Sequence, residues 1–361
     1  MANKKINYVK ESKVRKILDE NDYLVLLGER SNGKSYCVKS MVVKDCIKND
    51  RKFIYLRRYD LDIKDNLCSR YFGDVPVSSM IEGDDFDNID VYRKDVWLSK
   101  YDDEKKKNKH IKKIGYCIPL SNDERQKSLV YADVDYIIME EFVSKDGRYL
   151  YNECDRLQNF VSSVFRNNRK GKVILIGNTI SRMCVYYREW QLNGIKKQKL
   201  GTVDKYIFKN DNGDDTRLAV YLTDSLNINT GMFFGNSAKS ITKGSYEVSE
   251  QPHLPKHLKD YAIVYQFVLQ HNDFMYLCKL LRDKEDASIY VWYVEPKTSE
   301  IKEKTRVISN LFNPSPYYSR TLKESINDKE KMIFGMFRKQ KVCFADNLTG
   351  TEFNNIISDY L

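Results

Sequence analysis

Residues 23–36 read YLVLLGERSNGKSY, and this stretch decides the fold. The apolar run from 23 to 27 stops at Gly28, as a buried parallel strand would. Residues 28–35 match the pattern G-x-x-x-x-G-K-[ST], and helical spacing follows over 35–48. A chance match in a lysine-rich chain would lack the strand before the motif and the helix after it. The order therefore predicts a P-loop, whose backbone N–H groups surround phosphates at a helix N-terminus.

In this loop Lys34 would reach the β and γ phosphates of a nucleotide, and Ser35 would ligate Mg²⁺. The guanine-reading pattern N-K-x-D is missing, because neither Asn-Lys pair of the chain, at residues 3 and 108, continues to Asp. ATP with Mg²⁺ is therefore the expected cofactor. The loop and its exit supply the other predicted nucleotide-binding residues, which are Gly28, Glu29, Arg30, Ser31, Asn32, Gly33 and Tyr36.

Hydrolysis needs an acid beyond the P-loop, and the strand-like stretch 135–141 (DYIIMEE) supplies two. We predict that Glu140 addresses Mg²⁺, although Asp is commoner there, and that Glu141 is the general base that orients the attacking water. An ordinary acidic turn after a core strand is the alternative interpretation. Because a small-molecule kinase would not need the pair, the pairing favours an additional-strand, catalytic-glutamate (ASCE-type) ATPase.

Two further polar residues have competing interpretations. Asn178 follows the apolar run 173–176, where it would sense the γ-phosphate or hold the attacking water, but a helix cap explains it equally well. Arg166 follows a helix-like run and would suit an arginine finger that acts on a neighbouring subunit's nucleotide. A lone arginine is more often solvated or paired in a salt bridge, so the sequence leaves this role open.

The repeated order of strand and helix predicts an open, mainly parallel α/β sheet with its ligand crevice at the carboxyl ends of the strands. Residues 82–113 are acidic and then basic with little apolar periodicity, which we interpret as a surface insertion or lid. Three aromatic, β-branched runs at 261–269, 273–281 and 288–294 predict an antiparallel meander, and helical spacing returns at 323–337. The predicted division is a P-loop ATPase domain (1–195), a linker (196–252) and a small α+β domain (253–361).

The chain has 61 Lys and Arg against 51 Asp and Glu, a net charge of +10. Binding to a phosphate backbone explains this excess better than a solvated basic surface does, although charge alone does not identify the polyanion. Candidate contacts are Arg57-Arg58-Tyr59 and the lysines of the insertion (Lys105, Lys106, Lys107, Lys109, Lys112 and Lys113). Neither cluster contains a base-reading motif, so double-stranded DNA would be held without sequence preference.

Other function classes are disfavoured. No stretch reaches the ~18 consecutive apolar residues of a membrane helix, and the charged N-terminus lacks the apolar core of a secretory signal. We therefore expect no membrane partner and a cytoplasmic protein. The eight cysteines are scattered without a C-x-x-C pair and the chain has four histidines, so we expect neither a zinc site nor a disulfide framework.

Five runs, in this order and spacing, resemble the DNA-encapsidation ATPases of phi-29-like tailed phages: VLLGERSNGKSY, FIYLRRY, DYIIMEEF, SSVFRNNR and ILIGNTIS. The resemblance covers about residues 15–185. It implies that Arg166 is a trans-acting arginine finger and that Lys127 is a second basic residue that reaches across the subunit interface. It also implies a homopentameric ring on the portal vertex of the procapsid. Glu140 and Asp60 depart from the Asp and Lys usual in the family, and whether a packaging RNA takes part stays open.

The resemblance further implies an RNase H-like C-terminal domain that has lost nuclease function, unlike the larger terminase-like motors that cut DNA. The run 261–269 agrees, because it has no central acid, and the nearby Asp260 and Asp273 stand at strand ends. The expected function is ATP-driven translocation of double-stranded DNA into a viral procapsid, in the cytoplasm of the infected host and transiently at the portal vertex. The alternatives are another ring-forming translocase or helicase, and a nucleotide-switched assembly scaffold.

Overall fold

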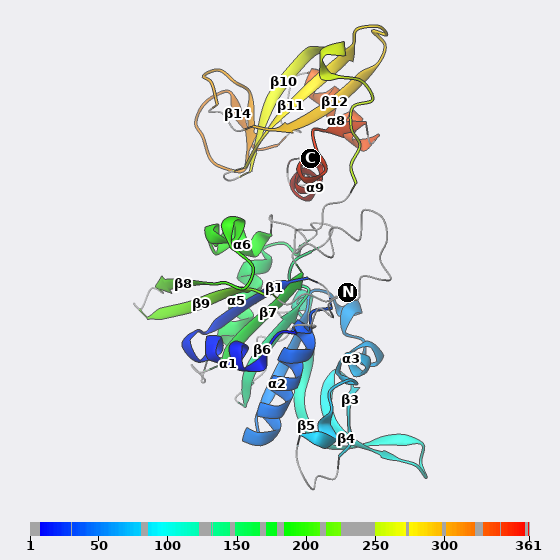
Figure 1. The fold of residues 1–361 in the computed structure, drawn as a ribbon, viewed down its shortest axis with the longest axis vertical. Helices are drawn as coiled ribbons and strands as arrows, with labels where there is room; N and C mark the ends of the chain where they lie inside the picture. The colour runs from blue at the N-terminus through cyan, green and yellow to red at the C-terminus, as the bar shows by residue number, and fades with distance from the viewer. Residues whose placement is uncertain are drawn as a thin grey trace, which may run out of the picture. The chain divides into compact units, whose positions relative to one another are not determined.

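The structure is a computed structural model that describes most of the chain in two compact units (Figure 1). The residues that it describes are 8–361 without 30, 81–85, 123–130, 132, 145–148, 167–170, 179–183, 210–213, 225–249, 272–273, 298–300, 322–327, 340, 358–359 and 361. Among the described residues, the first unit comprises those before residue 225 except Cys184, and the second comprises Cys184 and those after residue 249.

The first unit is built on a sheet of nine described strands in the order β3-β4-β5-β2-β6-β7-β1-β9-β8. The six strands from β5 to β9 in that order run parallel, and antiparallel strands extend the sheet at both edges. Strand β7 lies between β1 and β6, which confirms the additional strand between the P-loop strand and the acidic strand. The strands are β1 (Tyr23–Gly28), β2 (Lys52–Arg57), β3 (Asn88–Tyr92), β4 (Asp95–Asp102), β5 (Lys107–Pro119), β6 (Val134–Glu140), β7 (Lys172–Asn178), β8 (Val203–Lys209) and β9 (Asp215–Leu222).

Helices cover both faces of this sheet. Alternate residues of the central strands, such as Leu24 and Leu26, pack in one core with α1 (Glu11–Glu20), α2 (Lys34–Asn49) and α3 (Asp65–Phe72). On the opposite face lie α5 (Glu153–Val164) and α6 (Val185–Glu189), whose Tyr186 hydroxyl is 3.6 Å from Met139 Sδ of β6. Short 3-10 helices span Asp60–Ile63, Val77–Ser79, Leu120–Asn122, Asn193–Lys197 and Leu258–Asp260. The parallel strands thus deliver their carboxyl ends to one edge, as predicted.

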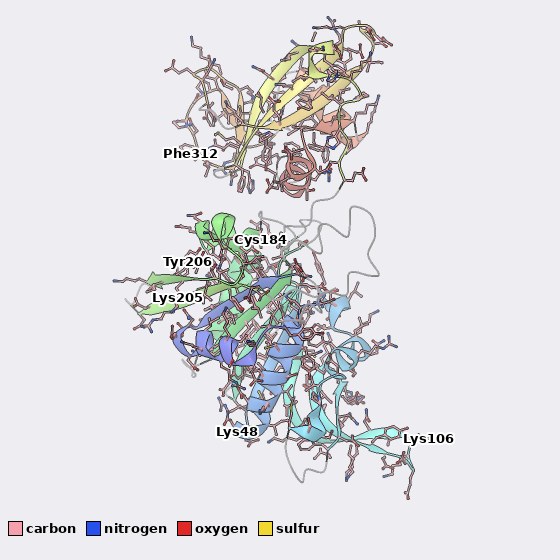
Figure 2. All side chains as sticks on the ribbon, in the orientation of Figure 1. Lys48, Lys106, Cys184, Lys205, Tyr206 and Phe312 are labelled. Atoms are coloured by element: carbon pink, nitrogen blue, oxygen red, sulfur yellow. The ribbon has the colours of Figure 1, made fainter. Side chains whose placement is uncertain are left out.

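The prediction of a surface insertion or lid at 82–113 is wrong. This region forms β3, β4 and the first half of β5, and β5 continues beside β2 as a parallel strand. Its apolar second half is mostly buried, whereas the exposed Lys107 and Lys109 of its first half alternate with the partly covered Asn108 and His110. Because lysines are closely spaced in this stretch, the sequence does not show the alternation of exposed and covered residues that is typical of a strand. Figure 2 shows Lys106 at the tip of the β4–β5 hairpin.

The predicted linker at 196–252 also needs correction, because its first part belongs to the first sheet. Strand β9 pairs in parallel with β1, and β8 forms the edge beyond it. The reason is the apolar run 218–222 (LAVYL), which is buried in the sheet. Residues 225–249 lie outside the described part of the chain.

The second unit has a six-stranded sheet in the order β14-β13-β10-β11-β12-β15. Strands β10, β11 and β12 form the predicted antiparallel meander, while β13 runs parallel to β10 and β14 to β13. Trp292 and Phe353 belong to the core between this sheet and its two helices. The elements are β10 (Tyr261–His271), β11 (Phe274–Asp283), β12 (Tyr290–Pro296), β13 (Val307–Ser309), β14 (Tyr318–Ser319), α8 (Asp328–Arg338), β15 (Val342–Phe344) and α9 (Asn347–Ile356). The α+β class predicted for this region is confirmed.

All eight cysteines carry free thiols, and seven of them are buried. None of the described helices has the length and apolar character needed to cross a membrane.

Candidate nucleotide site

The P-loop connects β1 to α2 and depends on two glycines. Gly33 has φ +82° and caps α2 in the left-handed region, which favours glycine. A Cβ on Gly28 would lie 2.0 Å from the Oγ1 of Thr223, a residue that follows β9. The Asn32 side chain donates to the same Oγ1 at 2.8 Å. Thr223, directly after β9, therefore packs against the P-loop and supports it.

Lys34 lies across this loop with its ammonium group surrounded by oxygen atoms. Its Nζ donates to the backbone oxygens of Gly28 (3.1 Å) and Glu29 (2.5 Å), to Asn32 Oδ1 (3.0 Å) and to Asn178 Oδ1 (3.3 Å). The side chain is buried, and this burial lowers the pKa of Lys34 to about 8, although the charges of Glu140 and Glu29 oppose the shift. The structure thus brings Asn178, from the end of β7, to the predicted phosphate-binding lysine.

Glu140 ends β6 and is buried beside Ser35. Its carboxylate accepts hydrogen bonds from the Ser35 hydroxyl and, at 2.7 Å, from the Tyr71 hydroxyl of α3. Burial raises the pKa of Glu140, and these two hydrogen bonds oppose that shift. No ion pair among the described residues includes Glu140. The two residues predicted to address Mg²⁺, Ser35 and Glu140, are therefore in contact.

Glu141 points elsewhere. Its backbone is left-handed (φ +54°), a conformation that costs a non-glycine residue about 1–2 kcal/mol. Its exposed carboxylate forms an ion pair with Arg57 at the end of β2, with the Nη2–Oε2 distance at 2.7 Å. Arg57 also donates to the Tyr55 hydroxyl at 3.4 Å. The turn after β6 thus separates the two adjacent carboxylates and directs them to different partners.

Arg58 holds the turn that follows β6 in place. Its guanidinium forms a two-bond ion pair with the buried Glu153 of α5, at 2.7 and 2.9 Å. It also donates to the backbone oxygens of Glu141 (3.2 Å) and Phe142 (2.7 Å). The interpretation of Arg57-Arg58-Tyr59 as a DNA contact is therefore wrong for Arg58, which is buried, and Arg57 is engaged with Glu141.

The other predicted site residues have varied positions. Tyr36 lies on the first turn of α2 and is 46% exposed. Arg166 is exposed just beyond the end of α5, and no ion pair within the described part of the chain involves it. Arg30 and Lys127 lie outside the described residues.

Sequence reasoning missed three residues of the site. Tyr71 gave no signal, because nothing in its helix relates it to Glu140 more than 60 positions away. Thr223 follows an apolar run that was assigned to the linker, so recognising that strand would have found it. Arg57 was noticed for its charge, but its partner Glu141 is visible only once β2 and β6 are known to be adjacent.

This geometry agrees with what comparison with known proteins shows. The family model of the podovirus DNA encapsidation protein (Gp16) matches residues 12–207, which is more than half of the chain. The chain belongs to this family. The match includes the P-loop, both carboxylates, Asn178 and Arg166, whereas Thr223, which contacts the P-loop, lies beyond it.

Individual relatives agree with the family assignment. The chain is 31% identical over 168 residues to the DNA packaging protein of Bacillus phage B103, which covers 45% of this chain and 46% of that protein. It is 30% identical over 164 residues to the DNA packaging protein of Bacillus phage phi29, covering 45% and 44%. The matched region thus spans less than half of the length of each of these relatives. The bacteriophage Phi-29 viral genome packaging motor assembly shares its fold over 95% of this chain and 96% of that chain, with a TM-score of 0.53 and 21% identity.

Proposed function

We propose that this protein is a ring-forming ATPase that drives double-stranded DNA into a viral procapsid. The observation that carries the proposal is the single sheet edge at which the phosphate cradle around Lys34, the Ser35–Glu140 pair and Glu141 lie together, within a member of the encapsidation family. This is the arrangement required to bind a nucleotide and to activate a water beside its γ-phosphate.

The residues beside Lys34 fit Mg²⁺. Ser35 and Glu140 offer a hydroxyl and a carboxylate, the hard oxygen ligands that this ion takes, and the buried carboxylate accepts from two hydroxyls without an ion pair among the described residues. We assign both residues to holding the ion, Glu140 through its longer side chain. When bound, the ion neutralises charge on the phosphate oxygens. The chain's own cation for that purpose is Lys34, whose present oxygen partners a triphosphate would replace.

Glu141 is the proposed general base. In the structure its carboxylate is held by Arg57, so orienting an attacking water requires that this exposed ion pair be exchanged for the water. The backbone at Glu141 is left-handed, and Arg58 holds it by donating to the Glu141 backbone oxygen at 3.2 Å. Asn178, in contact with Lys34, is placed to sense the γ-phosphate.

The exposed Arg166 supports action between subunits, as an arginine finger on a neighbour's nucleotide, and Lys127 is proposed for the same interface. Mixing Arg166→Ala subunits with Lys34→Ala subunits should restore part of the ATP hydrolysis that each variant lacks alone, because some interfaces of a mixed ring combine an intact P-loop with an intact finger. A lack of rescue at every mixing ratio would contradict the assignment. We propose a homopentamer, and mass measurement of the nucleotide-bound ring tests that number.

DNA contacts are assigned to the β4–β5 hairpin rather than to Arg58. Lys112 pairs with Asp50 and Lys113 with Asp95, both at 2.7 Å, whereas Lys106, Lys107 and Lys109 are exposed and enter no ion pair among the described residues. Contacts of this kind are to phosphates, so DNA affinity should fall steeply with added salt. An affinity that ignores salt would argue against a backbone grip.

The second unit is proposed to be an RNase H-like domain without nuclease activity. Its strands β12-β11-β10-β13-β14 have the order and directions of an RNase H-type sheet, and β10 contains no Asp or Glu. Of the two acids noted at the strand ends, Asp260 accepts from the backbone N–H of His257 at 3.1 Å, and Asp273 lies outside the described residues. The proposed place of action is the portal vertex in the host cytoplasm; a packaging RNA is not assigned.

Phosphate release from ATP, measured with and without double-stranded DNA, tests the proposed function. We expect turnover that DNA stimulates, that Lys34→Ala abolishes and that Glu141→Gln reduces by about 10²–10⁴-fold with nucleotide binding retained. Absence of turnover in the intact chain would instead indicate a nucleotide-switched scaffold. Strand separation by the purified ring would indicate a helicase, and DNA uptake by procapsids would indicate packaging.

A further inference from the structure

Helix α3 connects the metal-site carboxylate to a strained turn at the edge of the sheet. Tyr71, near its carboxyl end, donates to Glu140 at 2.7 Å. Asp65, its first residue, holds the turn between β3 and β4. The helix has eight residues and so spans about 12 Å. Both contacts are made by one short, rigid element.

Neighbouring side chains hold the Tyr71 ring in place. One face stacks on Tyr55 of β2, with centroids 4.6 Å apart and planes at 30°. The Lys39 ammonium lies 4.4 Å from the ring centroid, donates to the Tyr71 backbone oxygen and pairs with Asp74 at 2.5 Å. The hydroxyl therefore cannot leave Glu140 by rotation of the side chain alone. A displacement of the Glu140 carboxylate must break this hydrogen bond or move α3.

The other end of α3 supports an unusual hairpin turn. Arg93 and Lys94 have φ values of +52° and +64°, the left-handed pair that a two-residue turn requires and that Gly and Asn normally supply. Each costs about 1–2 kcal/mol in this conformation. The Asp65 carboxylate accepts both backbone N–H groups, at 2.7 and 2.9 Å. Beyond that acceptor, the two side chains make only exposed contacts among the described residues, Lys94 with Asp60 and Arg93 over the Tyr92 ring.

The Arg93–Lys94 turn also contacts β5, the strand that carries the lysines. The Lys94 backbone oxygen accepts from the Cys117 N–H of β5 at 2.7 Å. Ser69 of α3 accepts from the Val91 N–H at 2.9 Å and donates to Asp90, whose carboxylate contacts His110 of β5 at 3.0 Å. A shift of α3 therefore reaches β5 by two routes.

We propose that Tyr71 positions Glu140 and that α3 transmits changes at this carboxylate to the Arg93–Lys94 turn, and through it to the β4–β5 hairpin. The inference rests on the proposed role of Glu140 at the metal. It makes Tyr71 a positioning residue and α3 the link between nucleotide state and the lysine-bearing hairpin. A rigid helix that ends on a strained turn suits this role, because a small shift removes the contacts that stabilise the turn.

Hydrogen exchange of the Arg93 and Lys94 amides in the full chain tests the link, since both N–H groups are bonded to Asp65. We expect their exchange rates to differ at least threefold between ADP with Mg²⁺ and ADP with EDTA. Tyr71→Phe keeps the ring stack and loses only the hydroxyl. In this variant each amide should exchange at the same rate with Mg²⁺ as with EDTA. Tyr101→Phe, an exposed tyrosine on the same hairpin, should behave as the unaltered chain does.

A second readout measures the positioning itself. The factor by which Mg²⁺ increases ADP affinity should fall about fivefold or more in Tyr71→Phe, because a hydrogen bond to a charged group is lost. In Asp65→Asn the turn should exchange faster in both conditions while the Mg²⁺ factor stays unchanged. This variant separates the two ends of α3.

Three outcomes would overturn the inference. Equal exchange at the turn in the unaltered chain with and without Mg²⁺, despite an intact Mg²⁺ factor, would overturn the transmission alone. A Mg²⁺-dependent difference that persists in Tyr71→Phe would remove Tyr71 from the link. An ADP affinity that Mg²⁺ does not change in the unaltered chain would overturn both this inference and the metal assignment.

Discussion

Two buried glutamates, one in each unit, share a local environment and differ in one neighbour. Glu140 accepts from the Tyr71 hydroxyl at 2.7 Å, and Glu330 accepts from the Tyr265 hydroxyl at 2.5 Å. Glu330 also receives the Arg306 guanidinium, with Nε at 3.0 Å from its Oε1. Glu140 receives the Ser35 hydroxyl instead, and within the described residues it has no ion pair. Glu330 thus forms an ion pair, whereas Glu140, in the described part of the chain, has only hydroxyl hydrogen bonds and the more distant charges of Arg57 and Lys34.

The difference distinguishes a structural carboxylate from one available to a ligand. Burying a charge without a partner is expensive, and the usual solutions are an ion pair or a metal. The chain uses an arginine for Glu330, and another, Arg58, for Glu153 beside the site. At Glu140 burial raises the pKa, although the hydroxyls of Ser35 and Tyr71 and the charge of Arg57 oppose the shift. The comparison can be tested by changing the neutralising groups.

The largest effect is expected from Arg58→Met. It leaves Glu153, whose side chain is fully buried, without its cation, and breaking such a pair costs about 3–5 kcal/mol. The free energy of unfolding of the first unit, from urea titration of the full chain, should fall by this amount. The matched variant is Arg57→Met, whose partner Glu141 is 64% exposed, so a loss under about 1 kcal/mol is expected. Equal losses in both variants would show that Arg58 is not the structural member of the pair.

Arg306→Met should cost about 3 kcal/mol in the second unit, by the same reasoning. The value is smaller because Arg306 is 22% exposed, although Glu330 is buried. Hydrogen exchange in β10–β12 during urea unfolding reports on this unit separately. The double variant Arg306→Met with Glu330→Gln should recover most of the loss, since no buried charge then lacks a partner. A double variant as unstable as the single one would indicate lost packing instead.

Most of the site's own chain segments could be predicted from the sequence. The apolar run before Gly28, the glycine pattern and the pair Glu140-Glu141 each carry local information, because a strand, a tight loop and a strand end have characteristic residues. The same holds for the meander of the second unit, whose aromatic and β-branched runs became β10, β11 and β12.

The features that could not be predicted from the sequence are those that depend on which elements are neighbours in the fold. The lysines of β5 masked its alternation, so its place beside β2 was missed, and with it the extension of the sheet. Arg58 looked like a surface cation until α5 placed Glu153 against it. Charged residues that are buried in pairs have the same composition as solvated ones, so only the tertiary contact separates them.

Glu140→Gln should have the opposite sign from Arg306→Met. The amide removes a buried charge that has no ion pair within the described part of the chain, while its oxygen still accepts from Tyr71 and Ser35, so the nucleotide-free chain should gain about 1–2 kcal/mol. The gain should be accompanied by loss of the Mg²⁺-dependent part of ADP affinity. Urea unfolding without nucleotide and ADP titration with and without Mg²⁺ measure the two effects. A destabilised Glu140→Gln chain would place this carboxylate in the same class as Glu330.

The smallest effect concerns Lys34, the nearest candidate for a hidden partner of Glu140. A true ion pair would raise the pKa of Lys34, whereas burial lowers it to about 8 from an ordinary value of 10.5. Between these values the unfolded chain holds a proton that the folded chain has released, so unfolding stability rises with pH across this window. Phosphates bind the charged form, and ADP affinity should therefore be flat below pH 8 and fall about tenfold, or about 1.4 kcal/mol, per pH unit above it. Calorimetry in buffers of different ionisation enthalpy should detect the proton uptake. Lys34→Arg, which stays charged, should bind ADP with an affinity independent of pH from 7 to 9. If ADP affinity falls equally with pH in the unaltered chain and in Lys34→Arg, a group other than Lys34 causes the fall.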